Sequence, residues 1–384
     1  MSHSGDPRAS CSQSANESRF GRKIRDPRLT IMRSMTVSMR SFAKINLGLH
    51  IGAPRPDGFH DLLTVYQTIN LHDLIHVSLE RGSGIEIHCS DRRVPTGETN
   101  TCYRMVEGVL REFGKKASVR VEIDKRLPVQ GGLGGASANA VTTLLALEVL
   151  LKKTLPGPER LRIAADVGSD LPLFLVGGTV LGAGRGEQVY PLPDLPTIPC
   201  VVVTPEIGVS TPKAFAKWDQ LRAAGARASS SAKTAASAEL GSAGQRSAVP
   251  SRTRAKLTVS HGSDKMSELS YRLSAWLSGQ YSGAPAGRGR AENPLLALVR
   301  TGIKNDFEQV VFPEYPELDE AKAALLRAGA EYASLSGSGS TLYGLFAKKA
   351  AAETASIRLQ KLGWAAQVGD TIPRSAYWRR LFVR

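Results

Sequence analysis

A glycine-rich segment at residues 128–140 constrains the fold of this chain more than any other feature. It reads Pro-Val-Gln-Gly-Gly-Leu-Gly-Gly-Ala-Ser-Ala-Asn-Ala, so four glycines fall within the five positions 131–135. Such a run is costly inside a helix or strand, because each glycine loses much backbone entropy on ordering. It suits a place where the backbone closely approaches another group. The apolar segment 141–151 that follows is long enough for a buried helix.

A glycine-rich loop that opens a helix predicts a phosphate-binding site. The start of a helix presents unpaired N–H groups and the positive end of the helix dipole to an anion. The segment lacks the Gly-Lys-Ser/Thr of the P-loop. It also has Ser137 where the dinucleotide fingerprint has its third glycine, and Glu148 comes too early for the acidic residue expected about 20 positions on. A plain structural turn is the alternative, and the apolar helix with Ser137 at its mouth favours phosphate.

The charge of the chain is concentrated in two segments. The 384 residues carry a net charge of +15 and are enough for two domains. Residues 1–40 hold eight basic against three acidic residues and 221–290 hold eleven against three, which leaves +2 for everything else. A nearly neutral folded part argues against a nucleic-acid partner. No apolar run approaches the ~20 residues that cross a bilayer, so no membrane partner is expected.

The N-terminal segment and the cysteines favour a bacterial cytoplasmic protein over a plastid one. Residues 1–38 are expected to be a disordered extension without a secretory h-region. They are rich in Arg and Ser, as transit peptides are, but Asp6, Glu17 and Asp26 count against that function. The four cysteines form no C-x-x-C pair and are expected to be free thiols in a reducing compartment: Cys11, Cys89, Cys102 and Cys200.

Two segments before the glycine-rich loop carry candidate site residues. Residues 41–51 alternate as a half-buried strand does, which places Lys44 and Asn46 on one face. A solvated strand face is the alternative. The turn Pro-Asp-Gly at 56–58 then presents Phe59 and His60 side by side. An aromatic ring beside an imidazole suits a nucleobase, although a histidine after a turn is more often a surface residue.

The remaining pattern predicts a mixed α and β chain. We expect antiparallel strands over 62–91, with turns at 72–73 and 81–84. Helices are expected at 100–113, where Asn100 is the cap, and at 158–167. Strand 119–123 would bring Lys125 to the glycine-rich loop. Further strands are expected at 178–182 and 200–204, helices at 292–298, 305–308 and 317–330, and a disordered insertion at about 223–265.

Three strings together resemble the signatures of the GHMP kinases. They are Ala43-Lys44-x-Asn46, the glycine-rich loop, and the Gly/Ser turn 336–341 between two expected strands, in the family's order. The resemblance implies an α+β fold of two domains. The first, 39–197, would be an ATP-binding domain like domain 2 of ribosomal protein S5. The second, 198–384, would be a ferredoxin-like α/β sandwich that contains the insertion.

The resemblance also implies roles for individual residues. Lys44 and Asp170, within Gly-x-Asp-x-Pro-x-Phe at 168–174, would be catalytic. ATP would be bound by the loop and two flanking residues: Pro128, Val129, Gln130, Gly131, Gly132, Leu133, Gly134, Gly135, Ala136, Ser137, Ala138, Asn100 and Lys125. Substrate would be bound by Asn46, Phe59, His60, Thr211 and Phe215. Mg²⁺ would accompany ATP, with ligands that the sequence does not identify.

Within the family, the Asp-Gly-aromatic-His string resembles kinases that phosphorylate the 2-hydroxyl of a cytidine diphosphate-linked sugar alcohol on the route to isoprenoids. Phe59 stands where tyrosine is commoner. A monomer or homodimer is expected. One alternative is a homoserine- or mevalonate-type kinase of the same fold, which would not need aromatic residues around a base. The other is a non-catalytic nucleic-acid-binding protein that uses the basic insertion, and its binding would be lost on deleting 223–265.

Overall fold

The computed structural model describes residues 35–80, 82–224 and 304–383, which lie in one compact unit. The expected extension over 1–38 and the expected helix at 292–298 lie wholly or mostly outside these residues, as does nearly all of the insertion at 223–265. Strand β1 begins at Thr36, so regular structure starts three residues before Met39.

The first sheet is organised around one long strand. Its members are β1 (Thr36–Pro54), β2 (His60–Glu80), β3 (Gly84–Cys89), β4 (Ser118–Asp124), β5 (Thr179–Ala183) and β6 (Gln188–Pro191). Strand β1 pairs along one edge of β2, while β4 and β5 share the other edge, each antiparallel to β2. Strand β3 pairs parallel with β4, and β6 extends the sheet beyond β5.

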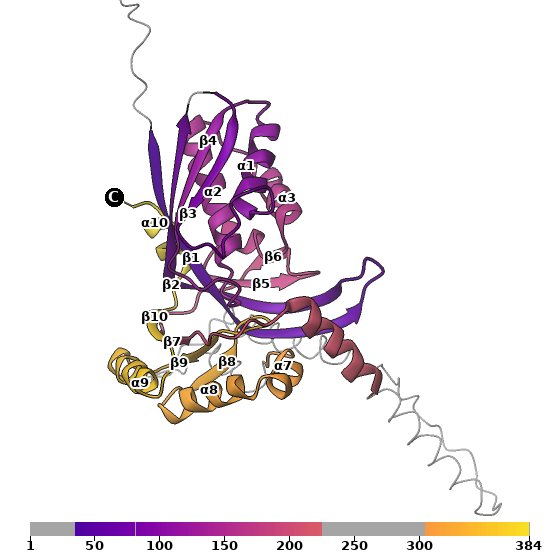
Figure 1. Ribbon diagram of the computed structural model, residues 1–384, viewed down its shortest axis with the longest axis vertical. Helices are drawn as coiled ribbons and strands as arrows, with labels where there is room; N and C mark the ends of the chain where they lie inside the picture. Colours follow the sequence, from indigo (N-terminus) through magenta and orange to yellow (C-terminus); the bar gives the residue numbers. More distant parts are fainter. Residues whose placement is uncertain (1–34, 81, 225–303, 384) are drawn as a thin grey trace, which may run out of the picture. The chain divides into compact units, whose positions relative to one another are not determined.

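Three helices cover one face of this sheet: α1 (Thr101–Glu112), α2 (Gly135–Leu151) and α3 (Gly157–Val167) (Figure 1). Helix α1 buries Cys102, Met105 and Val109 at helical spacing and is capped by the Asn100 side chain, which accepts from the Cys102 amide. Helix α2 is buried on nearly all sides, as its apolar sequence predicted. A short 3-10 helix, Pro172–Leu175, follows α3.

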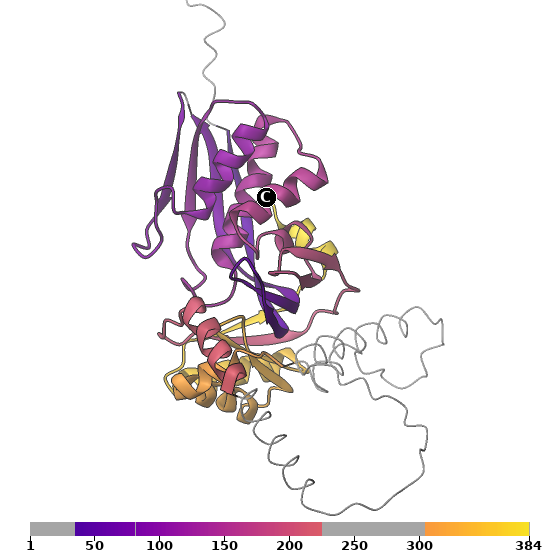
Figure 2. The ribbon, with the colours of Figure 1, turned by 90° about the vertical axis from the view of Figure 1, so that its right-hand side faces the viewer.

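The second sheet has the order β10-β7-β9-β8, with all pairs antiparallel. Its strands are β7 (Pro199–Val203), β8 (Tyr332–Leu335), β9 (Leu342–Leu345) and β10 (Ala366–Asp370). Helices α7 (Glu308–Glu314), α8 (Pro316–Arg327) and α9 (Lys349–Lys361) cover one face (Figure 2). This is the expected ferredoxin-like order. Residues 211–224 are helical beside the β1–β2 hairpin, and α10 (Arg374–Arg380) lies near the C-terminus (Figure 1).

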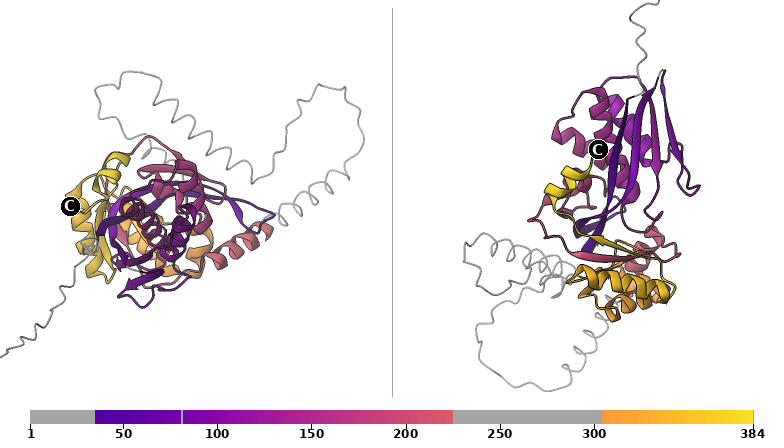
Figure 3. Two further views of the ribbon diagram at one scale, coloured as in Figure 1. Left: turned by 90° about the horizontal axis from the view of Figure 1, so that it is seen from above. Right: turned by 90° about the vertical axis from the view of Figure 1, so that its left-hand side faces the viewer.

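The two sheets share a hydrophobic core, and the packing of β1 against this core determines which face of β1 carries polar side chains. Ala43, Ile45 and Leu47 point into a cluster that includes Val202 of β7 and Leu345 of β9. Because strand side chains alternate, Lys44 and Asn46 lie on the opposite face of β1. The valine run of β7 is buried on both faces, with Val201 and Val203 under the second-sheet helices. Figure 3 shows the two sheets and their helices from two further directions.

The turn expected at residues 72–73 is wrong, because β2 continues through it without interruption. The polar pair was interpreted as a chain reversal. Instead, His72 pairs with Phe42 and Asp73 with Ser41 across the β1–β2 ladder. The Asp73 side chain is fully buried and is satisfied by hydrogen bonds from the segment after β4, which a local pattern does not reveal. Within 62–91, β2 and β3 run in opposite directions, as expected, but they do not pair with each other, because β4 lies between them, antiparallel to β2 and parallel to β3.

Candidate active site

The glycine-rich loop adopts a conformation that requires its glycines. Gly132 and Gly134 have φ of 77° and 70°, in the left-handed region, and α2 begins directly afterwards at Gly135. A Cβ on Gly132 would overlap the carbonyl oxygen of Ser336, and one on Gly134 would lie 3.1 Å from Cγ of Lys44. The loop therefore brings its backbone close to both other signature segments.

Those two segments hold the loop by hydrogen bonds. The Lys44 amide donates to the Leu133 carbonyl at 2.9 Å, and Lys44 Nζ donates to the Gly132 carbonyl at 2.8 Å. From the second sheet, Ser336 Oγ donates to the same Gly132 carbonyl at 2.9 Å. The three strings that lie far apart in the sequence thus meet at one point, beside the first turn of α2 with its unpaired amide groups.

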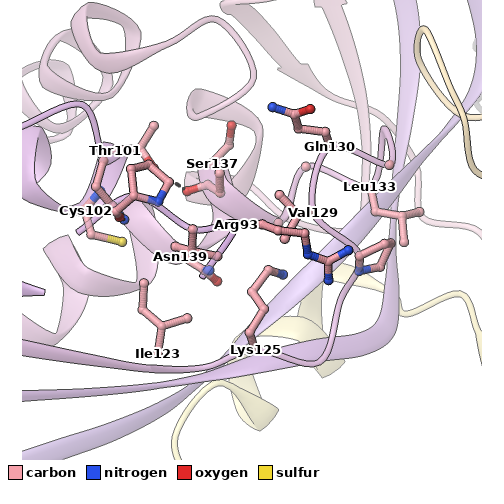
Figure 4. Close-up of a pocket in the computed structure, with 18 of the residues that line it drawn as sticks. Arg93, Thr101, Cys102, Ile123, Lys125, Val129, Gln130, Leu133, Ser137 and Asn139 are labelled. Carbon is pink, nitrogen blue, oxygen red and sulfur yellow. Dashed lines mark hydrogen bonds between the residues drawn. The ribbon is translucent and has the colours of Figure 1, made fainter. Parts of the chain in front are cut away.

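A cavity of about 280 Å³ lies on the outer side of the loop. It is lined by residues 128–137, by Asn100 and Thr101 at the start of α1, and by Lys125 and Arg93 (Figure 4). The Asn100 amide is used within the protein, since its oxygen caps α1 and its nitrogen donates to the Pro95 carbonyl. Thr101 Oγ1 donates to the Ala136 carbonyl at 2.8 Å and fixes α1 against the loop.

Asp73, which the sequence analysis took for a turn residue, organises this side of the loop. Its buried carboxylate accepts from Lys125 Nζ at 2.8 Å and from Asn139 Nδ2 at 3.0 Å. It also accepts from the backbone amides of Arg126 and Leu127, at 2.8 and 2.7 Å. One carboxylate thereby joins β2, the strand-to-loop connection and the first turns of α2. No sequence signal beyond its polarity pointed to this role.

A larger cavity, of about 710 Å³, lies on the other side of the loop and contains the two expected catalytic residues. Lys44 Nζ is 3.5 Å from Oδ2 of Asp170 and donates to Asn46 Oδ1 at 2.7 Å. Asp170 comes from the connection between α3 and the 3-10 helix, where buried Phe174 anchors the chain. Gln130, Gly132, Gly134 and Ser137 line both cavities, so the loop is the wall between them.

Tyr66 on β2 is a further contact of Asp170 that the sequence analysis missed. Its hydroxyl donates to Asp170 Oδ1 at 2.9 Å. Burial, and next the negative charge of Asp170, raise the pKa of Tyr66 well above its ordinary value, so the phenol stays protonated. Burial lowers the pKa of Lys44 from its ordinary value, and the nearby Asp170 carboxylate opposes part of that shift.

The residues expected to bind a base lie at the far end of the larger cavity. Phe59, His60, Thr211 and Phe215 all line it. His60 and Phe215 stack directly on each other, with ring centroids 5.0 Å apart and planes 10° apart, and His60 Nε2 lies 2.8 Å from Asp219 Oδ1. A base between two rings needs about 7 Å, twice the ~3.5 Å contact distance of carbon atoms, so none fits between this pair.

Phe59 instead faces a cation. Its ring is half exposed, and the Arg185 guanidinium lies over it, 5.0 Å from the ring centroid. Arg185 lies in the turn of the β5–β6 hairpin and lines the larger cavity. The sequence analysis did not single it out, because no strand was predicted at residues 188–191 and the hairpin was therefore missed. The larger cavity therefore has a cation at each end, Lys44 near the loop and Arg185 near the aromatic residues.

The third signature segment is fixed by side chains from residues 305–308, at the start of α7. Asn305 Nδ2 donates to the carbonyls of Leu335 and Gly337, at 2.8 and 2.7 Å. Glu308 Oε1 accepts from the Leu335 amide at 2.9 Å. Thr211 Oγ1 lies within 2.7 Å of Ser338 Oγ, so Thr211 also ties the start of its helix to this turn.

The described residues hold neither a ready-made cluster of metal ligands nor a membrane-spanning helix. Across residues 35–80, 82–224 and 304–383, no three His, Cys, Asp or Glu side chains cluster as metal ligands would. Within the same part of the chain, no helix has the length and apolarity needed to cross a bilayer. Cys89, Cys102 and Cys200 are free thiols, as expected, and burial raises the pKa of Cys102 and Cys200 to about 12.

Comparison with known sequences agrees with the three signatures. Residues 100–178 match the family described as GHMP kinases N terminal domain, and residues 292–363 match GHMP kinases C terminal. The 4-diphosphocytidyl-2-C-methyl-D-erythritol kinase of Solibacter usitatus is 35% identical, with 80% of each chain covered. The protein of that name from Acaryochloris marina is 32% identical, with 84% of this chain and 91% of the relative covered.

Comparison with solved structures confirms the predicted fold. A crystal structure of 4-(cytidine 5'-diphospho)-2C-methyl-D-erythritol kinase superposes with a TM-score of 0.59 at 26% identity, covering 87% of this chain and 98% of that one. The mevalonate kinase of L. major also reaches 0.59, at 14% identity over 88% and 97% of the two chains, which shows a shared fold alone. With its two GHMP matches and its relatives at 32–35% identity, the chain belongs to the family of the 4-diphosphocytidyl-2-C-methyl-D-erythritol kinases, within the GHMP kinases.

Proposed function

We propose that this protein transfers the γ-phosphoryl group of ATP to the 2-hydroxyl of 4-diphosphocytidyl-2-C-methyl-D-erythritol, a step in the methylerythritol phosphate route to isoprenoids. One observation carries the proposal: the glycine-rich loop separates two cavities, and the Lys44–Asp170 pair lies in the larger one, beside the loop. A kinase needs this arrangement, because donor and acceptor must meet at a phosphate-binding element.

ATP is proposed to occupy the smaller cavity. Its phosphates would lie on the amides of residues 131–137 at the start of α2, where unpaired N–H groups and the helix dipole stabilise negative charge. Lys125 and Asn100 line the same cavity, but both side chains are bound within the protein. Their proposed role is therefore to shape the nucleotide site. Lys125 would add positive charge only if its pairing with Asp73 loosens.

The acceptor alcohol is proposed to bind in the larger cavity with its hydroxyl at Asp170. An alcohol is far too weak an acid for a carboxylate to ionise in advance, so Asp170 would accept the proton as the new P–O bond forms. Lys44 would stabilise the negative charge that develops at the reacting oxygen. Asn46 would be held for the substrate by its bonds to Lys44 and to Thr64 Oγ1.

The cytidine end is proposed to contact the aromatic residues at the mouth of the cavity. Because His60 already covers one face of Phe215, the base would stack on Phe59, displacing Arg185, or else separate His60 from Phe215. His60 offers a ring nitrogen at the same place and Thr211 lines the wall. This end distinguishes the proposal from a homoserine or mevalonate kinase, and the names of the relatives at 28–40% identity also favour it.

Mg²⁺ is proposed to accompany ATP. Since no cluster of three ligating side chains is found in the described residues, the metal would be held chiefly by phosphate oxygens, as Mg²⁺ commonly is. The Ser137 hydroxyl and the Asp170 carboxylate are among the side-chain oxygens that line the larger cavity. When bound, the metal would neutralise charge on the phosphates. We also propose a bacterial cytoplasmic location and a monomeric or dimeric state.

A substrate panel tests the function. Purified full-length protein with ATP and Mg²⁺ is offered 4-diphosphocytidyl-2-C-methyl-D-erythritol, mevalonate or homoserine, and ADP is measured directly. We expect kcat/KM for the cytidine diphosphate substrate to exceed the other two by at least about 1,000-fold, because a site built for hydrogen bonds rejects a substrate that lacks them. Equal or higher activity on mevalonate or homoserine would refute the proposal.

A further inference from the structure

Tyr66 is placed at the reacting carboxylate although none of the three signature strings contains it. Its ring is buried, and its hydroxyl is the hydrogen-bond donor to Asp170 Oδ1, at 2.9 Å. Lys44 Nζ lies 5.7 Å from the centroid of the same ring. Tyr66 thus contacts both residues of the proposed catalytic pair from a third direction, strand β2.

The neighbouring hairpin is shaped around this phenol. Gly182 of β5 pairs with Thr64 of β2, and a Cβ on Gly182 would overlap the Tyr66 ring. A Cβ on Gly186, in the β5–β6 turn, would lie 2.6 Å from the Tyr66 hydroxyl. Two glycines therefore leave the space that the ring and its hydroxyl occupy. The phenol is held in place by packing, so its direction toward Asp170 is fixed before substrate binds.

The two carboxylate oxygens of Asp170 have different partners. Oδ1 accepts from Tyr66, whereas Oδ2 lies 3.5 Å from Lys44 Nζ, beyond the 2.7–3.2 Å of an N–H···O hydrogen bond. Lys44 donates at shorter distances to Asn46 Oδ1 and to the Gly132 carbonyl. Oδ2 is therefore the oxygen with capacity left for a substrate hydroxyl.

We propose that Tyr66 is a positioning residue for phosphoryl transfer, which holds Oδ1 of Asp170 so that Oδ2 receives the substrate proton. In this step the substrate O–H bond breaks and its proton passes to Oδ2. The substrate oxygen forms a bond to the γ-phosphorus, and the bond from that phosphorus to the bridging oxygen breaks, with its electron pair leaving on ADP. Tyr66 keeps its own proton throughout. The inference rests on the proposed function, because it assigns Asp170 as the base.

One consequence separates this role from simple packing. Removal of the hydrogen bond frees the Asp170 carboxylate to rotate, which lowers the rate of the chemical step more than it weakens substrate binding. The other charges near this carboxylate are Lys44 on β1 and the Arg185–Glu187 pair of the β5–β6 hairpin, and a change at Tyr66 leaves all three in place.

The test compares Tyr66→Phe with Tyr377→Phe in the full-length protein. Tyr377 is an equally buried phenol whose hydroxyl donates to the Phe174 carbonyl at 2.7 Å and not to a site carboxylate. We expect Tyr66→Phe to lower kcat by about 10- to 100-fold with KM for both substrates within about threefold. Tyr377→Phe should lower Tm and leave kcat and both KM values unchanged.

Two results would overturn the inference. One is a Tyr66→Phe variant whose kcat matches that of the wild type. The other is a Tyr377→Phe variant with the same loss of kcat at unchanged KM, which would assign the effect to packing. Failure of the proposed function is seen separately, because the wild type would then prefer another acceptor in the substrate panel, and the two variants would be compared on that acceptor.

Discussion

Within the described part of the chain, two lysine–aspartate pairs flank the glycine-rich loop, one on each side, and they differ in how completely the carboxylate is satisfied. In the pair on the side of the smaller cavity, Lys125 Nζ lies 2.8 Å from Asp73, and the two side chains are 7% and 0% exposed. In the pair on the other side, Lys44 Nζ lies 3.5 Å from Asp170, and the side chains are 3% and 37% exposed.

The difference indicates which carboxylate supports the loop and which one can receive a ligand. Asp73 accepts hydrogen bonds from two side chains and two backbone amides, so it has little capacity left for a ligand. Asp170 accepts from Tyr66 and opens onto the larger cavity. The same two residue types thus hold the glycine-rich loop in shape in one place and line the larger cavity in the other.

The largest expected effect separates the two aspartates by activity. Asp170→Asn should lower kcat by at least about 1,000-fold, because the amide cannot accept the substrate proton. The affinity for ATP should stay within a few fold, since ATP is proposed to occupy the other cavity. The Asp170 carboxylate is partly exposed, and Lys44 Nζ keeps its hydrogen bonds to Asn46 Oδ1 and the Gly132 carbonyl, so the free energy of unfolding should fall by less than in Asp73→Asn. Steady-state kinetics, nucleotide titration and denaturant unfolding measure these quantities.

The matched control is Asp166→Asn, which changes an exposed carboxylate near the end of α3 that pairs only loosely with Arg162, at 3.6 Å. It should leave kcat, ATP affinity and stability at wild-type values. If Asp170→Asn kept more than about a tenth of wild-type kcat, Asp170 would not be the base.

The second-largest effect concerns the Lys125–Asp73 pair, where we expect a loss of stability instead of a loss of the chemical step. Asp73→Asn should lower the free energy of unfolding by about 3–5 kcal/mol, because it leaves the Lys125 ammonium buried without a counter-charge. ATP affinity should fall as well, since the connection into the loop loses its anchor. Thermal or urea unfolding measures the first change, and nucleotide titration the second.

A double variant checks the cause. Adding Lys125→Met to Asp73→Asn removes the unpaired charge and should restore part of the lost stability. Should Asp73→Asn alone unfold at the wild-type denaturant midpoint, the structural role assigned to this pair would be wrong.

The smallest expected effect concerns the pH at which Lys44 loses its charge. Burial lowers the pKa of Lys44 below its ordinary value of 10.5, so the ammonium deprotonates at a lower pH than an exposed lysine does. If catalysis needs this cation, kcat/KM should fall on the alkaline side at a pH below 10.5. Lys44→Arg should move that limb to higher pH, because arginine keeps its charge. ADP formation followed at several pH values gives both profiles.

The free energy of unfolding should rise with pH over the range in which kcat/KM falls. Between the lowered pKa of Lys44 and 10.5 the unfolded chain binds the extra proton, so this residue makes the free energy of unfolding rise with pH in that window. Lys361→Arg, a change of an exposed lysine at the end of α9, is the control and should shift neither profile. An alkaline limb that is the same in the wild type and in Lys44→Arg would assign the titration to another group.

Local patterns were sufficient for much of the fold and of the site. The glycine run predicted a loop that opens a buried helix, and the structure confirms it with α2 beginning at Gly135. Alternation placed Lys44 and Asn46 on one face, and their side chains are joined by a 2.7 Å hydrogen bond. Asn100 was expected to cap α1 and does so. These features depend on residues close together in the chain, so periodicity and turn chemistry suffice to find them.

The sequence by itself therefore determined that the chain has a glycine-rich loop that opens a buried helix, a strand with a polar face and an aspartate that follows a short helix. Only the tertiary structure decided that the Asp73 carboxylate is buried and fully hydrogen-bonded while that of Asp170 faces a cavity. Burial and hydrogen-bond partners come from residues far along the chain. Asp73 is satisfied by residues 52 to 66 positions away, and Asp170 is held by Tyr66 across 104 positions. No local pattern encodes such distances, and the packing of the two sheets and their helices sets them.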